Sequence, residues 1–210
     1  MGEYGFIAAI AGVLVAGAMS PGPSFFVVAQ NALSRSRADG LLTAVGTALG
    51  VALFALLAGL GVVTLLHETP LLYFVLKLAG GLYLLWIALT IWRHAREPLE
   101  ALTTHANGPS GAWASFRQGL IVQISNPKTA IVIAGIFAAF VPQEPPAYTV
   151  PLVAVVAYVI DFLWYAVVAI TLSGASSRAL YQRAKPYFDR GAALFLVLVA
   201  LRLMISPIPG

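Results

Sequence analysis

Long stretches of the chain contain at most one charged side chain, and each is long enough to cross a lipid bilayer. A helix needs about 20 apolar residues to span the hydrocarbon core. Six such runs follow one another: Tyr4–Ser34, Gly40–Leu66, Thr69–Trp92, Gln118–Gln143, Pro145–Ser177 and Gly191–Gly210. None of the runs has the period-two alternation of a membrane barrel strand. The pattern therefore predicts six transmembrane helices.

The composition agrees with a membrane protein. Apolar residues make up 60% of the 210 residues, and charged residues make up only 10%, whereas a soluble domain has about 25% charged residues. Because lipid cannot hydrogen-bond to the backbone, apolar spans of this kind fold as helices. The predicted fold class is an all-α integral membrane protein. The chain has no Cys, which excludes disulfides and thiol catalysis.

The Lys and Arg residues predict how the chain crosses the membrane. Nine of the twelve lie in the connections after the first, third and fifth runs. Since Lys and Arg are enriched on the cytoplasmic side, we expect these connections in the cytoplasm and both termini outside it. This placement explains the net charge of +4, and no nucleic-acid partner is expected. We also expect the first run to be retained and not cleaved, because Glu3 precedes it without any Lys or Arg.

Two of the six runs are interrupted by proline at matching places. The first contains Ser20-Pro21-Gly22-Pro23, and the fourth contains Ser125-Asn126-Pro127-Lys128. Proline lacks the N–H of the helical hydrogen bond and disfavours helical geometry at the preceding residue. We therefore expect each helix to stop and restart, with Pro23 at the first position of its second half and Asn126 as an N-cap. The alternative is a simple kink, which membrane helices tolerate.

The two interrupted runs divide the chain into similar halves. Each is followed by two continuous runs, and the polar residues 96–111 between the halves are expected to form a cytoplasmic linker. The predicted units are residues 1–95 and residues 112–210. Because each holds three spans, an odd number, the units would point in opposite directions. This is the 3+3 inverted repeat of secondary transporters, whose sites lie where broken helices meet near the midplane.

Each predicted break would leave backbone groups without helical partners. The N–H groups that begin a second half-helix suit a carboxylate, and the carbonyl groups that end a first half-helix suit an ammonium group. Gly22 adds room for a ligand, because it has no side chain. A zwitterionic amino acid needs both poles close together, although the same groups would fit other small anions or dipolar solutes.

Asp161 lies in the middle of the fifth run. A charge at the bilayer centre costs at least about 2.5 kcal/mol, so the carboxylate should face a cavity or a partner. The partner is either Lys128, in a permanent structural pair, or a substrate amine that exchanges with a proton; a protonated and inert Asp161 is a third alternative. Polar residues such as Thr47 and Gln123 are interpreted as interhelical contacts. The candidate binding residues are Pro21, Gly22, Pro23, Ser24, Asn126, Pro127, Lys128 and Asp161.

Motifs of enzymes and of nucleotide- or metal-binding proteins are missing from the sequence. His67, His94 and His105 are scattered without metal-ligand spacing, and no Gly-x-x-x-x-Gly-Lys-Ser/Thr loop occurs. We expect no enzymatic activity, no metal and no cofactor, and no direct use of ATP.

Several segments together resemble a known family. The Pro-Gly-Pro and Asn-Pro-Lys interruptions, the glycines Gly40, Gly46 and Gly50, and the segment Lys77–Trp86 are similar to the lysine exporter family (LysE/RhtB, threonine/homoserine efflux). The resemblance covers essentially the whole chain. It implies export of amino acids or close derivatives across the bacterial inner membrane, driven by the proton gradient. Asp161 matches an acidic position of several members, whereas Ser24 replaces a common asparagine, which affects substrate preference.

The sequence therefore predicts a proton-coupled antiporter that exports amino acids from a site between the two breaks. Residues 22–24 would receive the substrate carboxylate, Asn126 and Lys128 would line the second break, and Asp161 would bind the amine or a proton. The partners expected are the amino acid, protons and the lipid bilayer, with a homodimer left open. The alternatives are a passive channel or pore, a cation exporter of the same fold, and a membrane scaffold that transports nothing.

Overall fold

The computed structural model describes residues 5–19, 22–68, 70–96, 111–141, 145–171 and 175–205, and within these ranges all regular structure is α-helical. The helices in these ranges are α1 (Gly5–Met19), α2 (Pro23–Ser34), α3 (Arg37–Glu68), α4 (Pro70–His94), α5 (Ala112–Ile124), α6 (Pro127–Phe140), α7 (Thr149–Thr171) and α8 (Ala175–Ile205). The predicted all-α class is confirmed.

Both proline-interrupted runs are broken helices. α1 and α2 meet at an angle of 57°, and α5 and α6 meet at 59°. Pro23 and Pro127 are the first residues of α2 and α6. Proline suits this position, because the N–H of the first helical residue has no partner within the helix and proline has no N–H. The breaks expected from the sequence are therefore present in both places. Ser20 and Pro21 lie outside the described residues.

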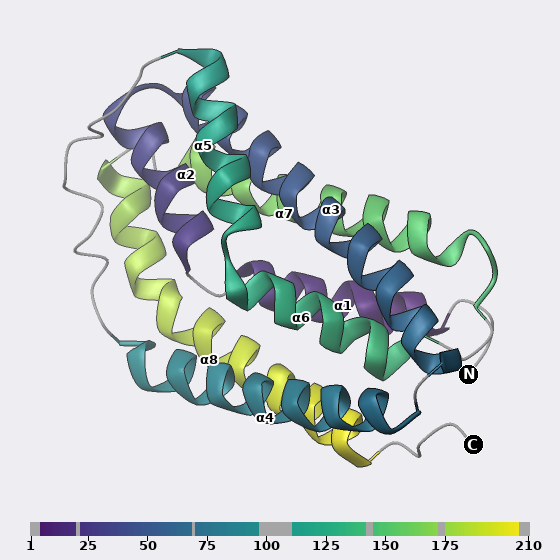
Figure 1. Ribbon diagram of the computed structural model, residues 1–210. Helices are drawn as coiled ribbons and strands as arrows, with labels where there is room; N and C mark the ends of the chain where they lie inside the picture. The colour runs from purple at the N-terminus through teal and green to yellow at the C-terminus, as the bar shows by residue number, and fades with distance from the viewer. Residues whose placement is uncertain are drawn as a thin grey trace.

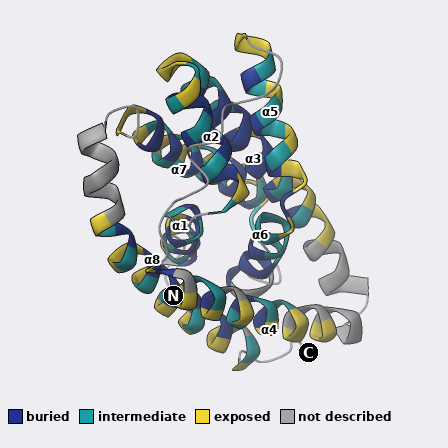
Figure 2. Ribbon diagram, turned by 90° about the vertical axis from the view of Figure 1, so that its left-hand side faces the viewer, coloured by how far each residue is buried: buried dark blue, intermediate teal, exposed yellow. Residues whose placement is uncertain are grey.

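The helices surround the two half-helices α1 and α6 (Figures 1 and 2). α2, α3, α5 and α7 pack together on one side, and α4 and α8 lie side by side on the other. α1 contacts α7 and α8, whereas α6 contacts α3 and α4. The first turn of α1 and the last turn of α8 lie at the same end of the molecule (Figure 1). The two breaks thus lie between these two groups of helices, with Asn126 buried and Pro23 and Pro127 exposed.

Glycines bring α3 and α5 into backbone contact. A Cβ at Gly46 would overlap the main-chain oxygen of Phe116, and a Cβ at Gly119 would overlap that of Thr43. Small residues allow this approach in membrane bundles. The same side of the molecule holds a buried polar cluster, in which the Asn31 amide donates to the hydroxyl of Thr43 at 2.8 Å.

The outside of the bundle is apolar. Leu57, Leu60 and Leu198 are each more than 60% exposed, which is the arrangement that lipid favours. Within the described residues, Arg37–Gly61 and Thr149–Thr171 are long and apolar enough to span a membrane, and the two bent pairs raise the number of candidate spans to four. The structure therefore supports a helical membrane protein.

The connection expected after the fifth run is instead the start of a helix. α8 begins at Ala175 and continues through Pro186 to Ile205. Lys185 and Asp189, one turn apart, form a buried ion pair across this proline, and a pair at this spacing stabilises a helix. The sequence interpretation of residues 178–190 as a connecting loop was wrong for the described part of α8, where the chain is helical.

Candidate functional site

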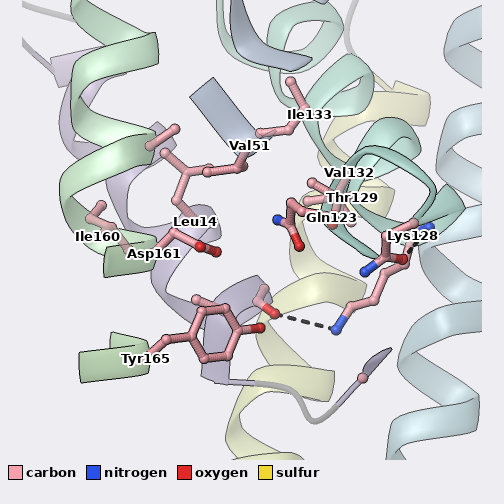
Figure 3. Close-up of a pocket in the computed structure, with 15 residues that line it drawn as sticks. Leu14, Val51, Gln123, Lys128, Thr129, Val132, Ile133, Ile160, Asp161 and Tyr165 are labelled. Carbon is pink, nitrogen blue, oxygen red and sulfur yellow. Dashed lines mark hydrogen bonds between the residues drawn. The ribbon is translucent and has the colours of Figure 1, made fainter. Parts of the chain in front are cut away.

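The two breaks and the middle of α7 line one partly open pocket of about 40 Å³ (Figure 3). Asp161 and Tyr165 reach it from α7, and Gln123 and Lys128 approach from the opposite side. Apolar side chains such as Leu14 complete the lining. Residues next to both breaks therefore line the same pocket.

At the first break, Gly22 is the residue before α2 and has an extended backbone, with φ −160° and ψ −172°. This conformation is open to any residue, so the glycine is not required by its dihedral angles. A Cβ at Gly22 would lie 3.8 Å from the Lys128 ammonium nitrogen. The missing side chain therefore leaves space at the pocket wall, as the sequence predicted.

At the second break, Asn126 caps α6. Its side-chain oxygen accepts a hydrogen bond of 3.1 Å from the main-chain N–H of Lys128. This is the N-cap role predicted from the sequence. The Asn126 side chain is 6% exposed and lines the pocket, so one residue both starts the half-helix and contributes a polar group to the site.

A chain of buried side chains joins the two breaks. The Ser24 hydroxyl donates to the side-chain oxygen of Gln123, and the Asn126 amide donates to the Ser24 hydroxyl at 3.4 Å. Ser24 and Gln123 are each 2% exposed. The Gln123 side-chain oxygen accepts the hydrogen bond from Ser24. Its amide nitrogen can therefore donate to a ligand in the pocket.

Lys128 reaches back from α6 to the end of α1. Its ammonium donates to the main-chain oxygen of Gly17 at 3.3 Å (Figure 3). The last carbonyl groups of a helix lack helical partners and carry the negative end of its dipole, so a cation is stabilised there. The carbonyl end that the sequence assigned to a substrate ammonium is thus bound by a lysine of the protein.

Asp161 is 6% exposed and lines the pocket. Its carboxylate interacts with the buried Thr47 side chain and, through its charge, with Lys128. The second carboxylate oxygen, Oδ2, is buried without a hydrogen-bond partner in the described part of the chain. Lys128 donates one hydrogen bond to Gly17, so its ammonium contacts the end of α1 as well as acting on Asp161 through its charge.

The predicted site residues divide into two groups. Gly22, Asn126, Lys128 and Asp161 line the pocket. Three others lie near it: Ser24 hydrogen-bonds to Gln123, and Pro23 and Pro127 are the exposed first residues of their half-helices. Pro21 lies outside the described residues.

Sequence reasoning missed three polar residues of the lining. Gln123 was interpreted only as an interhelical contact, and it is that contact as well as part of the pocket wall. Tyr165 lies one helical turn after Asp161, a spacing that places both on one face, so the sequence did contain a signal for it. Thr129 follows Lys128 directly and carried no separate signal.

Comparison with known proteins identifies the family. The family model described as LysE type translocator matches residues 15–207, which is most of the chain. This protein belongs to the LysE type translocator family. The translocator thus carries out transport and is not an enzyme, as the sequence predicted.

Efflux proteins of enteric bacteria are among the relatives of the translocator. It is 31% identical over 199 residues to a threonine efflux protein of Escherichia coli K12, covering 94% of this chain and 96% of the relative. A threonine efflux protein of Salmonella typhimurium is 30% identical over 200 residues, with the same coverage. A leucine efflux protein of Salmonella choleraesuis is 31% identical over 126 residues, covering 60% of this chain and 58% of the relative. No solved structure matches the translocator.

Proposed function

We propose that this translocator exports a small zwitterionic amino acid across the bacterial inner membrane in exchange for protons, from the pocket between its two breaks. One observation carries the proposal: residues next to both breaks and the carboxylate of Asp161 line the same pocket. The names of the threonine and leucine efflux relatives support this class of cargo.

The proposed architecture is six spans in two oppositely directed halves, with both termini outside the cytoplasm. The packing of the broken helices supports it. α1 contacts α6, and α2 contacts α5. This pairing is expected when the two broken spans cross the membrane in opposite directions. The continuous helices also pair between the halves, α3 with α7 and α4 with α8. Sites between broken helices of inverted repeats are typical of secondary transporters.

The charges of the pocket suggest how the cargo lies. Asp161 has a carboxylate oxygen without a hydrogen-bond partner, which suits the cargo ammonium. Gln123 and Lys128 on the opposite wall, together with the start of α2 at Gly22, suit the cargo carboxylate, because all of them offer N–H groups or positive charge. In this orientation the cargo spans the pocket between α7 and the two breaks.

Coupling to protons follows from competition at one carboxylate. A buried Asp161 needs a positive partner or a proton to remain in the membrane. When the cargo leaves, a proton replaces its ammonium on Asp161, and when the proton leaves, cargo binds again. Each exchange moves cargo one way and a proton the other, which is antiport.

The small volume of the pocket favours a carrier over an open pore. The cavity of about 40 Å³ is far below the roughly 300 Å³ of small pockets for drug-sized ligands. In the proposed mechanism, the helices move apart to make room for an amino acid. A passive channel needs a continuous path, whereas a carrier needs a site that closes around its cargo.

The test is efflux of radiolabelled threonine and leucine from reconstituted vesicles, measured at several external pH values. We expect saturable export that depends on the pH gradient. Asp161→Asn should abolish the pH dependence and reduce export at least tenfold, while Asp161→Glu, the matched control that keeps the carboxylate, should retain part of both. Full export by Asp161→Asn with unchanged pH dependence would remove this residue from the mechanism.

A further inference from the structure

The pocket is polar at one end and apolar at the other. Its apolar end consists of four buried side chains, each from a different helix: Leu14, Val51, Ile133 and Ala157. Its polar end consists of the side chains next to the second break and those on the facing part of α7: Gln123, Asn126, Lys128, Thr129, Asp161 and Tyr165. Val51 and Ile133 lie on the upper side of Figure 3, whereas Lys128 and Tyr165 lie on its lower side. The two ends would therefore face different parts of a cargo molecule.

On α6 and α7, one helical turn separates the polar end from the apolar end. Ala157 precedes Asp161 by four residues on α7, and Ile133 follows Thr129 by four residues on α6. Residues four apart lie on the same face of a helix, about 6 Å from each other along its axis. Because α6 starts at the second break, Ile133 is one turn farther from this break than Thr129.

α1 and α3 show the same change from polar to apolar. Leu14 lies three residues before Gly17, which is the main-chain acceptor near the end of α1. Val51 lies four residues after Thr47, whose side chain interacts with Asp161. All four side chains of the apolar end also belong to one cluster of buried hydrophobic residues. The apolar end is therefore a continuous surface to which four helices contribute.

The apolar end offers no partner to a polar or charged group of the cargo. None of its four side chains can donate or accept a hydrogen bond. Among the described residues of the lining, Asp161 is the one acidic side chain and Lys128 the one basic side chain, and both belong to the polar end. A polar or charged group at the apolar end would lose its hydration without gaining a partner, which is strongly disfavoured.

We propose that the apolar end receives the side chain of the cargo, so that the translocator selects amino acids with an aliphatic side chain, such as valine and leucine. The inference rests on the proposed function, which places the cargo ammonium and carboxylate at the polar end. The cargo side chain branches from the carbon that carries both groups, so it extends from the polar end toward the apolar end. The four residues of the apolar end are then specificity-determining residues, because they contact the part in which amino acids differ.

Valine and threonine distinguish this proposal from a site that accepts any small amino acid. The two have nearly the same shape, and threonine has a hydroxyl group where valine has a methyl group. An apolar pocket rejects an isostere with an added hydroxyl by up to about 100-fold. We therefore expect the transport efficiency, which is the maximal rate divided by KM, to be at least about 10-fold higher for valine than for threonine. Lysine should not be exported, because its second ammonium would lie at the apolar end.

The test is efflux of valine, threonine and lysine from vesicles reconstituted with the wild type and with single variants. Val51→Thr replaces a side chain of the apolar end by its hydroxyl isostere, and Ala157→Ser adds a hydroxyl to it from another helix. A helical Thr or Ser can donate to the carbonyl one turn earlier and still accept a hydrogen bond from the cargo. Each variant should therefore reduce the preference for valine over threonine at least about threefold.

Val155→Thr is the matched control on α7, since Val155 is 59% exposed and is not among the lining residues of the pocket. It should leave the preference unchanged. The preference is a ratio of two cargoes measured on one preparation, so a smaller amount of folded protein does not alter it. Ala157→Ser keeps the test decisive if Val51→Thr fails to fold.

Three results would overturn the proposal: wild-type export of threonine as efficient as that of valine, export of lysine at the rate of valine, or an unchanged preference in both hydroxyl variants. Failure of the proposed function gives a different result, in which the wild type exports no amino acid or its export does not respond to pH. Export that depends on pH and shows no preference for valine refutes only the role of the apolar end.

Discussion

The Lys128 ammonium donates a hydrogen bond of 3.3 Å to the main-chain oxygen of Gly17, so a side chain from the second break binds the carbonyl end of the first. This contact crosses the pocket that both breaks line. In the proposed mechanism, the Asp161 carboxylate is the acceptor for the cargo ammonium. The two halves of the chain are therefore joined at the site by a charge-assisted hydrogen bond.

Removal of this charge should strongly reduce transport. We expect Lys128→Met to lower export about 10- to 100-fold, because a hydrogen bond to a charged group is worth about 1.5–3 kcal/mol. Lys128→Arg keeps the charge and should retain measurable export. The measurement is initial efflux of threonine from vesicles that contain equal amounts of folded protein. Wild-type export by Lys128→Met would contradict the account.

The contact between α3 and α5 should be intolerant of a single methyl group. In Gly119→Ala the new Cβ would overlap the main-chain oxygen of Thr43, so we expect a loss of about 1–3 kcal/mol in stability. Gly61→Ala is the matched control, since nothing lies within 4 Å of its Cβ, and its effect should stay within about 0.5 kcal/mol. Thermal unfolding in detergent compares the two. Equal melting temperatures would show that the close packing is absent.

The hydroxyl of Ser24 should stabilise the connection between the breaks. Ser24→Ala leaves the buried Gln123 oxygen without its donor, which costs about 1–3 kcal/mol. Ser34→Ala is the control on the same helix, because Ser34 is exposed, and it should change stability little. Unfolding of the two purified variants should differ by several degrees. Identical unfolding curves would contradict a role for Ser24 in holding the breaks together.

The proposed topology places opposite ends of the bundle on opposite sides of the membrane. Since the chain has no Cys, a single introduced thiol reports its own position. Ala112 and Ala147 are both exposed, the first at the start of α5 and the second before α7. In intact cells a membrane-impermeant thiol reagent should label Ala147→Cys and not Ala112→Cys. The reverse result would invert the topology.

Local chemistry made much of the site predictable from the sequence. Proline in two apolar runs, next to Gly22 in the first, predicted both breaks. The side chain of Asn126 predicted its cap, because these effects act over one helical turn. An Asp inside an apolar span predicted a cavity or partner, since its burial is costly. Asp161 does lie at the pocket.

Features that depend on how helices rotate against each other could not be predicted. The lysine that binds Gly17 comes from 111 residues farther along the chain, and no local pattern encodes that distance. Asp189 was missed because its charged neighbours resemble a solvated loop, whereas the structure places it in α8, buried against Lys185. The backbone contact of Gly46 with α5 likewise depends on tertiary packing.

The central claim is that both breaks line one cargo site, and protection of single thiols tests it most directly. Ala18 lines the pocket from α1 and Thr129 lines it from α6, whereas exposed Ala147 serves as the control. In variants that still export, saturating cargo amino acid should slow thiol modification of Ala18→Cys and Thr129→Cys alike and leave Ala147→Cys unchanged. Cargo that protects only one of the two pocket positions, or neither, would contradict the account.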